Sequence, residues 1–518
     1  MNAKSYSFDE ARSASQIKRG AVMGYLAIVL NSIAGLLFTP WMVQRIGTSS
    51  FGLYTLALSL INLFLIEFGL SEAVSRFVSK YLVLDDKDAV SRVLGTIFKL
   101  YLLLALIMLA GLVLLYFRLE AIFSGLTPAE LERFKIVYVI SATYSLVAFP
   151  FIPFNGILTA YEKFYELRGC DLLQKAASVL LTVLALYGNL GLYALVLASV
   201  VSGTMNIAAK GLIIHRTLAL VVDWSFRSGS HVRAILKFSA WSGVATVAQR
   251  FIFNISPSIL GAVVGSGGIA IFGVAASLEG YVYTFATGLT GLFLPKVMRL
   301  LINEDSGSTV LPLMIKVGRV QLAIIGLLVA GFACVGKEFI ILWLGAEFEA
   351  AYFGALLLML PSVVYLPQMI GNTALIALNR VRVQGYVYIA MAITNVVLSL
   401  LLSRIWGVLG ACTAIFIAYS LRNIGMNMVY HKVLRVSVLD FFRQCHLSLA
   451  PPIMVAVCFG ALMNWVLPEP VLWSLMCKGG AFVLVYSFSI WAWGLNSYEK
   501  DLFGRGLKRV VSRSEGSG

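Results

Sequence analysis

Long apolar runs separated by short polar connections make up nearly the whole chain. About fourteen of these runs are long enough to cross a bilayer, because roughly twenty helical residues span its hydrocarbon core. The pattern therefore predicts an all-helical integral membrane protein. The predicted spans are residues 20–44, 51–75, 94–117, 135–159, 171–188, 191–214, 238–262, 269–295, 313–335, 352–378, 384–403, 406–430, 447–467 and 471–495.

The chain contains an internal repeat. The residues from Ile46 to Leu60 return in altered form from Val264 to Leu278, which is 218 positions later. A second pair of segments, Phe149–Ala160 and Leu366–Ala377, is related by nearly the same offset. Two segments that share one offset indicate duplication, and duplicated membrane proteins are often transporters with the substrate site between the repeats.

The repeat predicts two lobes of six helices each and two further helices. An even number of helices returns the chain to its starting side, so the lobes are parallel rather than inverted. The predicted parts are a cytoplasmic N-terminal segment at 1–19, a first lobe at 20–214, a cytoplasmic linker at 215–237, a second lobe at 238–430, additional helices at 431–495 and a basic cytoplasmic tail at 496–518.

Composition and charge agree with a membrane protein. Hydrophobic residues are 59% of the 518, and the mean hydropathy of +0.88 exceeds that of soluble chains. The net charge of +15 lies mainly in connections on one side of the membrane, which the positive-inside rule assigns to the cytoplasm. This placement predicts cytoplasmic termini and contacts between the tail and membrane lipids, and it argues against a nucleic-acid partner.

No enzyme chemistry is expected. Residues 1–18 are polar and precede a full-length span, so we expect no cleaved signal peptide. The sequence has no Walker A, HExxH or CxxC motif, and its four histidines lie in or beside predicted cytoplasmic loops without metal-ligand spacing. We therefore predict no catalytic residue, metal or cofactor.

Prolines interrupt the fourth predicted helix and its repeat counterpart, the tenth. Pro150 and Pro153 lie in the fourth helix, and Pro361 and Pro367 lie in the tenth. Proline frees a backbone carbonyl and bends a helix, and paired interruptions point to a cavity or a hinge. The four prolines are predicted hinge residues, with kinks that serve packing alone as the alternative.

A mid-span arginine marks a candidate substrate site. Charge in the bilayer is costly without a partner or water, and Arg250 lies midway along the seventh helix. The repeat aligns Gln249 with Asn31 of the first helix. Because guanidinium offers phosphate a planar fork of donors, Arg250, Gln249 and Asn31 are predicted to bind an anionic group. A structural ion pair or an interhelical hydrogen bond is the alternative.

Further cations lie nearer the ends of spans. Arg45 and Arg76 are placed to flank a cavity mouth, and Lys99 is a further candidate for substrate binding. Anchoring at the membrane interface is the alternative for both arginines. Snorkelling to the interface is the alternative for Lys99 and is the interpretation for Lys478.

Two carboxyl groups are candidates for binding a coupling ion. Glu67 lies in the second helix and Glu279 in the eighth, and they are not repeat equivalents. A carboxyl group within the bilayer needs a proton, a cation or a basic partner. A fixed salt bridge is the alternative for each.

The segment from Gly47 to Tyr81, GTSSFGLYTLALSLINLFLIEFGLSEAVSRFVSKY, resembles the start of bacterial polysaccharide-biosynthesis flippases of the Wzx type. Their superfamily includes MATE exporters and lipid II flippases, and a looser similarity continues through FNGILTAYEKF. The resemblance implies a MATE/flippase-like fold in the bacterial inner membrane. It also implies transfer of undecaprenyl-diphosphate-linked oligosaccharide to the periplasmic leaflet by alternating access, for a surface polysaccharide such as O-antigen. A polysaccharide polymerase and a chain-length regulator are the implied candidate partners.

The resemblance further implies a cationic central cavity, for which Arg250 and then Arg45, Lys99 and Arg76 supply charge. Two alternatives stay open. A MATE-like proton- or sodium-coupled antiporter of drugs or cations would use acidic groups such as Glu67 and Glu279. A non-transporting scaffold of a glycan-assembly complex would need none of these side chains.

Overall fold

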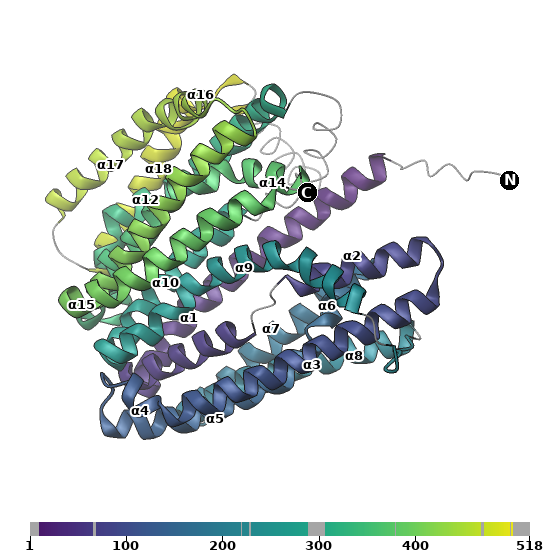
Figure 1. The fold of residues 1–518 in the computed structure, drawn as a ribbon. Coiled ribbons are helices and arrows are strands. Elements are labelled where there is room, and N and C mark those ends of the chain that lie inside the picture. The colour runs from purple at the N-terminus through teal and green to yellow at the C-terminus, as the bar shows by residue number, and fades with distance from the viewer. Residues whose placement is uncertain are drawn as a thin grey trace, which may run out of the picture. The chain divides into compact units, whose positions relative to one another are not determined.

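The computed structural model of the chain consists of helices and their connections (Figure 1), with no strand in the part that it describes. Of residues 10–31 only the helical backbone is described. The structure describes residues 10–500 except 66–68, 219, 227–228, 288–305, 379, 468–470 and 498.

Seventeen α-helices make up most of this part, and short tighter or wider turns interrupt them. The α-helices are α1 (Glu10–Phe64), α2 (Leu70–Val83), α3 (Lys87–Phe117), α4 (Leu119–Ile122), α5 (Pro128–Ala148), α6 (Pro153–Ala160), α7 (Phe164–Tyr187), α8 (Gly191–Leu218), α9 (Gly229–Val263), α10 (Ser266–Thr287), α12 (Ser306–Leu344), α13 (Ala350–Tyr365), α14 (Met369–Ala377), α15 (Val381–Val433), α16 (Val438–Phe442), α17 (Ser448–Val466) and α18 (Leu472–Ser489). The 3-10 turns are η1 (Phe149–Phe151), η3 (Ala346–Phe348) and η4 (Leu366–Gln368), and the π turns are η5 (Arg443–Leu447) and η6 (Ile490–Gly494).

Eleven helical stretches of the described residues are long and apolar enough to cross a membrane. They confirm the predicted all-helical membrane protein, but they do not confirm the count of fourteen. One reason is that α15, counted once, has 53 residues, or about 80 Å of helix against a hydrocarbon core of about 30 Å. Gly407 divides it with a φ of 57°, and Gly47 divides α1 with a φ of 79°. Glycine adopts these angles at little cost.

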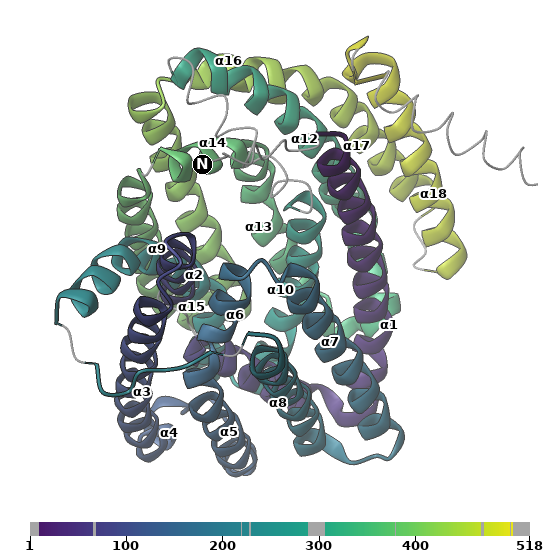
Figure 2. The same ribbon diagram turned by 90° about the vertical axis from the view of Figure 1, so that its right-hand side faces the viewer.

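The helices pack into two compact units, which are described separately. Unit 1 comprises residues 1–40, 275–380 and 423–518, and unit 2 comprises 41–274 and 381–422. In unit 1, α12 packs against α13, α17 and α18, and α17 lies beside α18 (Figure 2). In unit 2, α7 packs along α8 and α2 against α6. Each unit draws on both halves of the repeat, and the two predicted lobes remain a prediction.

Tryptophans lie at both ends of the helix pair α17 and α18 in unit 1. Trp465 and Trp473 lie where α17 ends and α18 begins, and Trp491 and Trp493 lie at the opposite end, after α18. Their exposed fractions range from 44% to 82%. Exposed tryptophans at both ends of a helix pair are typical of side chains at the two membrane interfaces.

The repeat is visible in the backbone. Gly47 and Gly265, which the sequence aligns, have φ angles of 79° and 100°. The aligned prolines Pro150 and Pro367 each lie at the start of a 3-10 turn, η1 and η4. The two halves therefore turn and break at equivalent positions.

Candidate functional site

Three of the predicted site residues fall outside the described residues or side chains. Glu67 lies in the undescribed segment 66–68. Arg250 and Asn31 lie in the helical backbones of α9 and α1, but their side chains are outside the described residues. Gln249 is half-buried in α9. The predicted roles of these four residues stay predictions.

The peripheral cations have separate surroundings in unit 2. The Nη1 of Arg45 donates to the side-chain oxygen of Asn189 at 2.9 Å. Lys99 donates from Nζ to the backbone carbonyl of Phe226 at 2.8 Å, so its ammonium holds the linker after α8. Arg76 is exposed on α2. Substrate roles for these three cations also stay predictions.

The linker lies against α3 through a turn centred on Asp223. The Asp223 amide donates to the carbonyl of Ser91 at 3.2 Å. The hydroxyl of Ser225, at 2.6 Å, and the amides of Ser225 and Phe226 donate to the carboxyl. These bonds, the hydroxyl first, hold the pKa of Asp223 below its usual value. Residues 220–226 are not helical.

A cavity of about 390 Å³ opens beside this linker. Three carboxyl groups, Asp85, Asp86 and Asp88, line it with Lys87 and Tyr161. An acidic lining repels a diphosphate. This cavity is therefore not our candidate for the cargo site.

One carboxylate joins the two halves of the repeat within unit 2. Glu130 in the first turn of α5 accepts hydrogen bonds from Ser49, at 2.6 Å, and from Ser266. These serines follow Gly47 and Gly265, the equivalent turns of the two halves. A capping box at the start of α5 fixes the carboxylate. We call these three side chains the serine–glutamate bridge, and the predicted topology places it at the periplasmic end.

Close glycine contacts accompany the bridge where α1 and α10 cross. A Cβ on Gly273 would lie 2.7 Å from the Thr55 methyl group, and a Cβ on Gly52 would lie 2.0 Å from the Ser266 carbonyl oxygen. Thr55 and Gly273 are 218 positions apart and are therefore repeat equivalents. The two halves therefore pack tightly at this crossing.

We expect Gly52→Ala to weaken this crossing, because the new methyl group meets a backbone oxygen that cannot rotate away. The expected cost is about 1–3 kcal/mol of stability, measured by thermal unfolding of the purified protein in detergent. Gly267→Ala in α10 is the matched control, since nothing lies within 4 Å of its Cβ position. Equal melting of the Gly52 variant and the native chain would contradict the tight crossing.

Glu279 is a buried carboxyl group in unit 1. It is 5% exposed and accepts a hydrogen bond from Ser362 at 3.3 Å. Ser362 follows Pro361 in α13, so the carboxyl group lies beside a predicted hinge. Within the described part of the chain, no basic side chain forms an ion pair with Glu279. Because an uncompensated buried charge is costly, this environment suits a group that takes up a proton or a cation.

In each half of the repeat, a side chain of a later helix donates a hydrogen bond to the segment that follows the proline break. Asn155, just after Pro153, accepts from Lys210 of α8 at 2.9 Å. Its repeat equivalent Asn372 accepts from Tyr430 of α15 at 2.9 Å. The segments after the breaks therefore have anchors in each half, as a hinge requires, but the hinge role stays a prediction.

Several buried charges were not identified from the sequence. Lys210 forms an ion pair with Asp171 at 2.9 Å, but both residues fall near the ends of predicted spans and look like interface residues. Arg422 is 4% exposed, and its Nη2 donates to the Tyr388 hydroxyl at 2.7 Å. Because Arg422 lies within the predicted span 406–430, the sequence could have identified it as a charge inside the membrane. Among the described residues, no three His, Cys, Asp or Glu side chains converge on a possible metal site.

The snorkelling interpretation of Lys478 is wrong. Lys478 is 1% exposed and forms an ion pair with Glu338 of α12. The lysine pairs with this half-buried carboxylate instead of reaching the interface, because a charged partner offsets the cost of burying the ammonium. The sequence could not reveal this partner, which is 140 residues away.

Comparison with known proteins gives a family and a fold. A family model described as polysaccharide biosynthesis protein matches residues 17–294. No curated protein matches the sequence. A structure described as lipid II flippase MurJ in an inward closed conformation has a TM-score of 0.67 and 15% identity, covering 94% of this chain and 99% of that one.

Transporter structures are similar too. An inward-facing multidrug resistance MATE family transporter of the MOP superfamily has a TM-score of 0.57 and 13% identity, covering 76% of this chain and 92% of that one. A MATE transporter of Vibrio cholerae has a TM-score of 0.55 and 11% identity, covering 82% and 98%. At these identities the likeness concerns the fold alone.

Proposed function

The chain belongs to the polysaccharide biosynthesis protein family, and on this premise we propose that it moves undecaprenyl-diphosphate-linked oligosaccharide from the cytoplasmic to the periplasmic leaflet. The family match carries the proposal, because it covers 278 of the 518 residues. The chain is a multi-pass membrane protein with a fold shared by flippases and transporters of the MOP superfamily. This fold supports a carrier rather than an enzyme.

The proposed cargo site lies around the middle of α9. Arg250 would bind the diphosphate, with Gln249 and Asn31 donating further hydrogen bonds. Arg45, Lys99 and Arg76 would supply positive charge at its edges. The mid-span position of Arg250 and its repeat alignment support this assignment, because charge within a span usually serves a site or a pair.

Movement of the cargo would follow alternating access. The serine–glutamate bridge and the α1–α10 crossing would close the periplasmic end, and the braced breaks at Pro150, Pro153, Pro361 and Pro367 would absorb the motion. Polar contacts between repeat halves support this idea, because such contacts can be exchanged for water without exposing a large apolar surface.

The proposed location is the bacterial inner membrane, with both termini in the cytoplasm. Lipid-linked oligosaccharide and membrane lipids would be the direct partners. A polysaccharide polymerase would act next, since the product of transfer is its substrate, and a chain-length regulator would control the extent of polymerisation. The cargo would serve the synthesis of a surface polysaccharide such as O-antigen.

Coupling to an ion gradient is proposed at Glu279, with Glu67 as the second candidate. Glu279→Gln keeps the shape and the Ser362 contact but removes the ionisable group. We expect this variant to fold normally and to lose at least about tenfold of the transport driven by an imposed proton or sodium gradient. Proteoliposomes with and without the gradient give the measurement, and the exposed Glu120→Gln is the control. An unchanged gradient response in Glu279→Gln would exclude this role.

The main rival is a MATE-like antiporter of drugs or cations. The environment of Glu279 favours this alternative, since a carboxyl group without a described basic partner suits a cationic cargo. Complementation distinguishes the functions. The flippase proposal predicts that a deletion strain loses surface polysaccharide and keeps its resistance to organic cations. Loss of resistance with normal polysaccharide would support the antiporter. Glycan transfer that is equally fast in liposomes with and without the purified protein would support the scaffold.

A further inference from the structure

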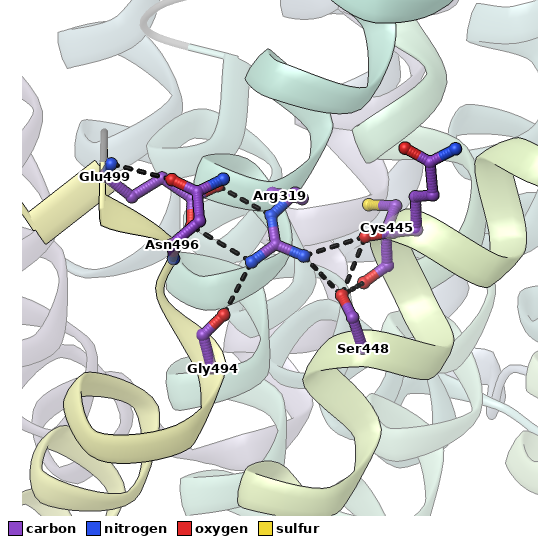
Figure 3. Close-up of polar contacts among 7 residues, drawn as sticks. Arg319, Cys445, Ser448, Gly494, Asn496 and Glu499 are labelled. Carbon is purple, nitrogen blue, oxygen red and sulfur yellow. Dashed lines mark hydrogen bonds and ion pairs between the residues drawn. The ribbon is translucent and has the colours of Figure 1, made fainter.

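An arginine of α12 holds the C-terminal end of the described chain (Figure 3). The Nε and Nη2 of Arg319 donate to the two carboxylate oxygens of Glu499 at 2.6 and 3.0 Å. Nη2 also donates to the Gly494 carbonyl at 2.5 Å. Nη1 donates to the Gln444 carbonyl at 2.8 Å and to the Ser448 hydroxyl. All five N–H groups of this guanidinium therefore have an acceptor.

The acidic partner is fixed by its own turn. The Asn496 amide donates to the Glu499 carboxylate, and the Glu499 amide donates to the Asn496 side chain, both at 2.9 Å. Glu499 is 1% exposed and Arg319 is 8% exposed. A buried pair with this many additional bonds holds one geometry, because breaking any part leaves a charge without compensation.

Two of the acceptors are carbonyls of π turns. Gln444 lies in η5, just before α17, and Gly494 ends η6, just after α18. A π turn closes its hydrogen bonds over five residues, which displaces carbonyls from the α-helical pattern. One guanidinium thus stabilises the irregular ends of two neighbouring helices.

The π turn η5 also forms a hydrogen bond to the helix that precedes a proline break. His446 of η5 donates from Nε2 to the Val363 carbonyl at 3.1 Å. Val363 lies four residues before Pro367, which has no N–H to give to that carbonyl. The ring of His446 rests against Phe442, with centroids 4.7 Å apart. His446 therefore supplies the hydrogen bond that the proline removes.

We propose that Gly494, Asn496 and Glu499 form a clasp that sets the proline break between α13 and α14. The connection runs from Glu499 through Arg319 to η5, and from His446 to Val363. When Arg319 loses its hydrogen bonds to Gln444 and Ser448, η5 changes from π-helical to α-helical hydrogen bonding. This change rotates the residues on one side of η5 by about 100° relative to those on the other side. That rotation removes His446 from Val363. Arg319 and Glu499 are positioning residues in this device, which operates whatever the cargo is.

Hydrogen exchange in the full-length protein tests the clasp. Glu499→Gln keeps the side-chain shape but removes the carboxylate, and so avoids the misfolding that Arg319→Ala invites. We expect amides of residues 364–372 to exchange about tenfold faster in this variant. Glu338→Gln is the matched control, because its ion pair with Lys478 also joins α12 to α18, and within the described part of the chain neither residue forms a hydrogen bond or ion pair with η5.

The outcomes are distinct. Faster exchange at 364–372 in Glu499→Gln but not in Glu338→Gln supports the clasp. Faster exchange confined to 494–500, or equal acceleration in both variants, overturns it. His446→Ala should accelerate the same amides, and adding Glu499→Gln should then have little further effect, since both act on one connection. Additive effects of the two substitutions would also overturn the clasp. A cargo other than lipid-linked oligosaccharide would leave these exchange results unchanged.

Discussion

A disulfide between cysteines placed at Ser49 and Ser266 is expected to reduce surface polysaccharide to the level of a deletion strain. The two hydroxyl oxygens lie 3.1 Å apart, so two sulfurs can approach bonding distance with little backbone movement. The predicted topology places both residues at the periplasm, which is oxidising. The disulfide would hold the repeat halves together at this end, and a carrier that must open there cannot complete its cycle.

The cross-link is made in a chain whose exposed Cys458 is replaced by serine. Gel mobility with and without dithiothreitol measures its formation, and surface polysaccharide measures transport. Each single cysteine should leave transport near normal, and reduction should restore it in the pair. Full polysaccharide from a chain that is shown to be cross-linked would contradict a periplasmic opening at the serine–glutamate bridge.

Arg250→Ala has the second large expected effect. Loss of charge-assisted bonds to a diphosphate should weaken binding by about 1.5–3 kcal/mol, or roughly 10–100-fold in affinity. Arg250→Lys should retain part of the activity, because an ammonium keeps the charge without the planar fork. Complementation of a deletion strain at equal membrane abundance gives the measurement.

A surface arginine provides the control for this test. The side chain of Arg168 in α7 is 80% exposed, so Arg168→Ala should leave polysaccharide unchanged. Arg250→Ala that restores polysaccharide as well as the native chain would exclude a cargo role for Arg250. The flippase proposal itself would still stand, because the family match does not depend on this side chain.

Local pattern was enough to predict the helical membrane fold and the repeat. Apolar runs mark helices because the bilayer requires all backbone groups to be bonded within each segment. The aligned Gly47 and Gly265 share positive φ, and the aligned Pro150 and Pro367 share 3-10 turns. These features depend on local backbone chemistry, which survives sequence divergence and can be seen in one chain.

The sequence alone could not predict which charged residues form ion pairs across long separations in the chain. Arg319 and Glu499 are 180 residues apart, and both lie near predicted ends of spans or beyond them, where charge needs no explanation. Lys478 suggested snorkelling for the same reason. Which distant carboxylate meets which cation depends on helix packing, and apolar periodicity carries little information about it.

Transfer of a defined cargo by the purified protein tests the central proposal most directly. Proteoliposomes would contain an undecaprenyl-diphosphate-linked oligosaccharide, and an added glycosidase would report its arrival in the outer leaflet. The account predicts protein-dependent acceleration that Arg250→Ala reduces and an organic cation such as ethidium does not inhibit. No acceleration by folded protein under an imposed ion gradient, together with ethidium transport, would contradict it.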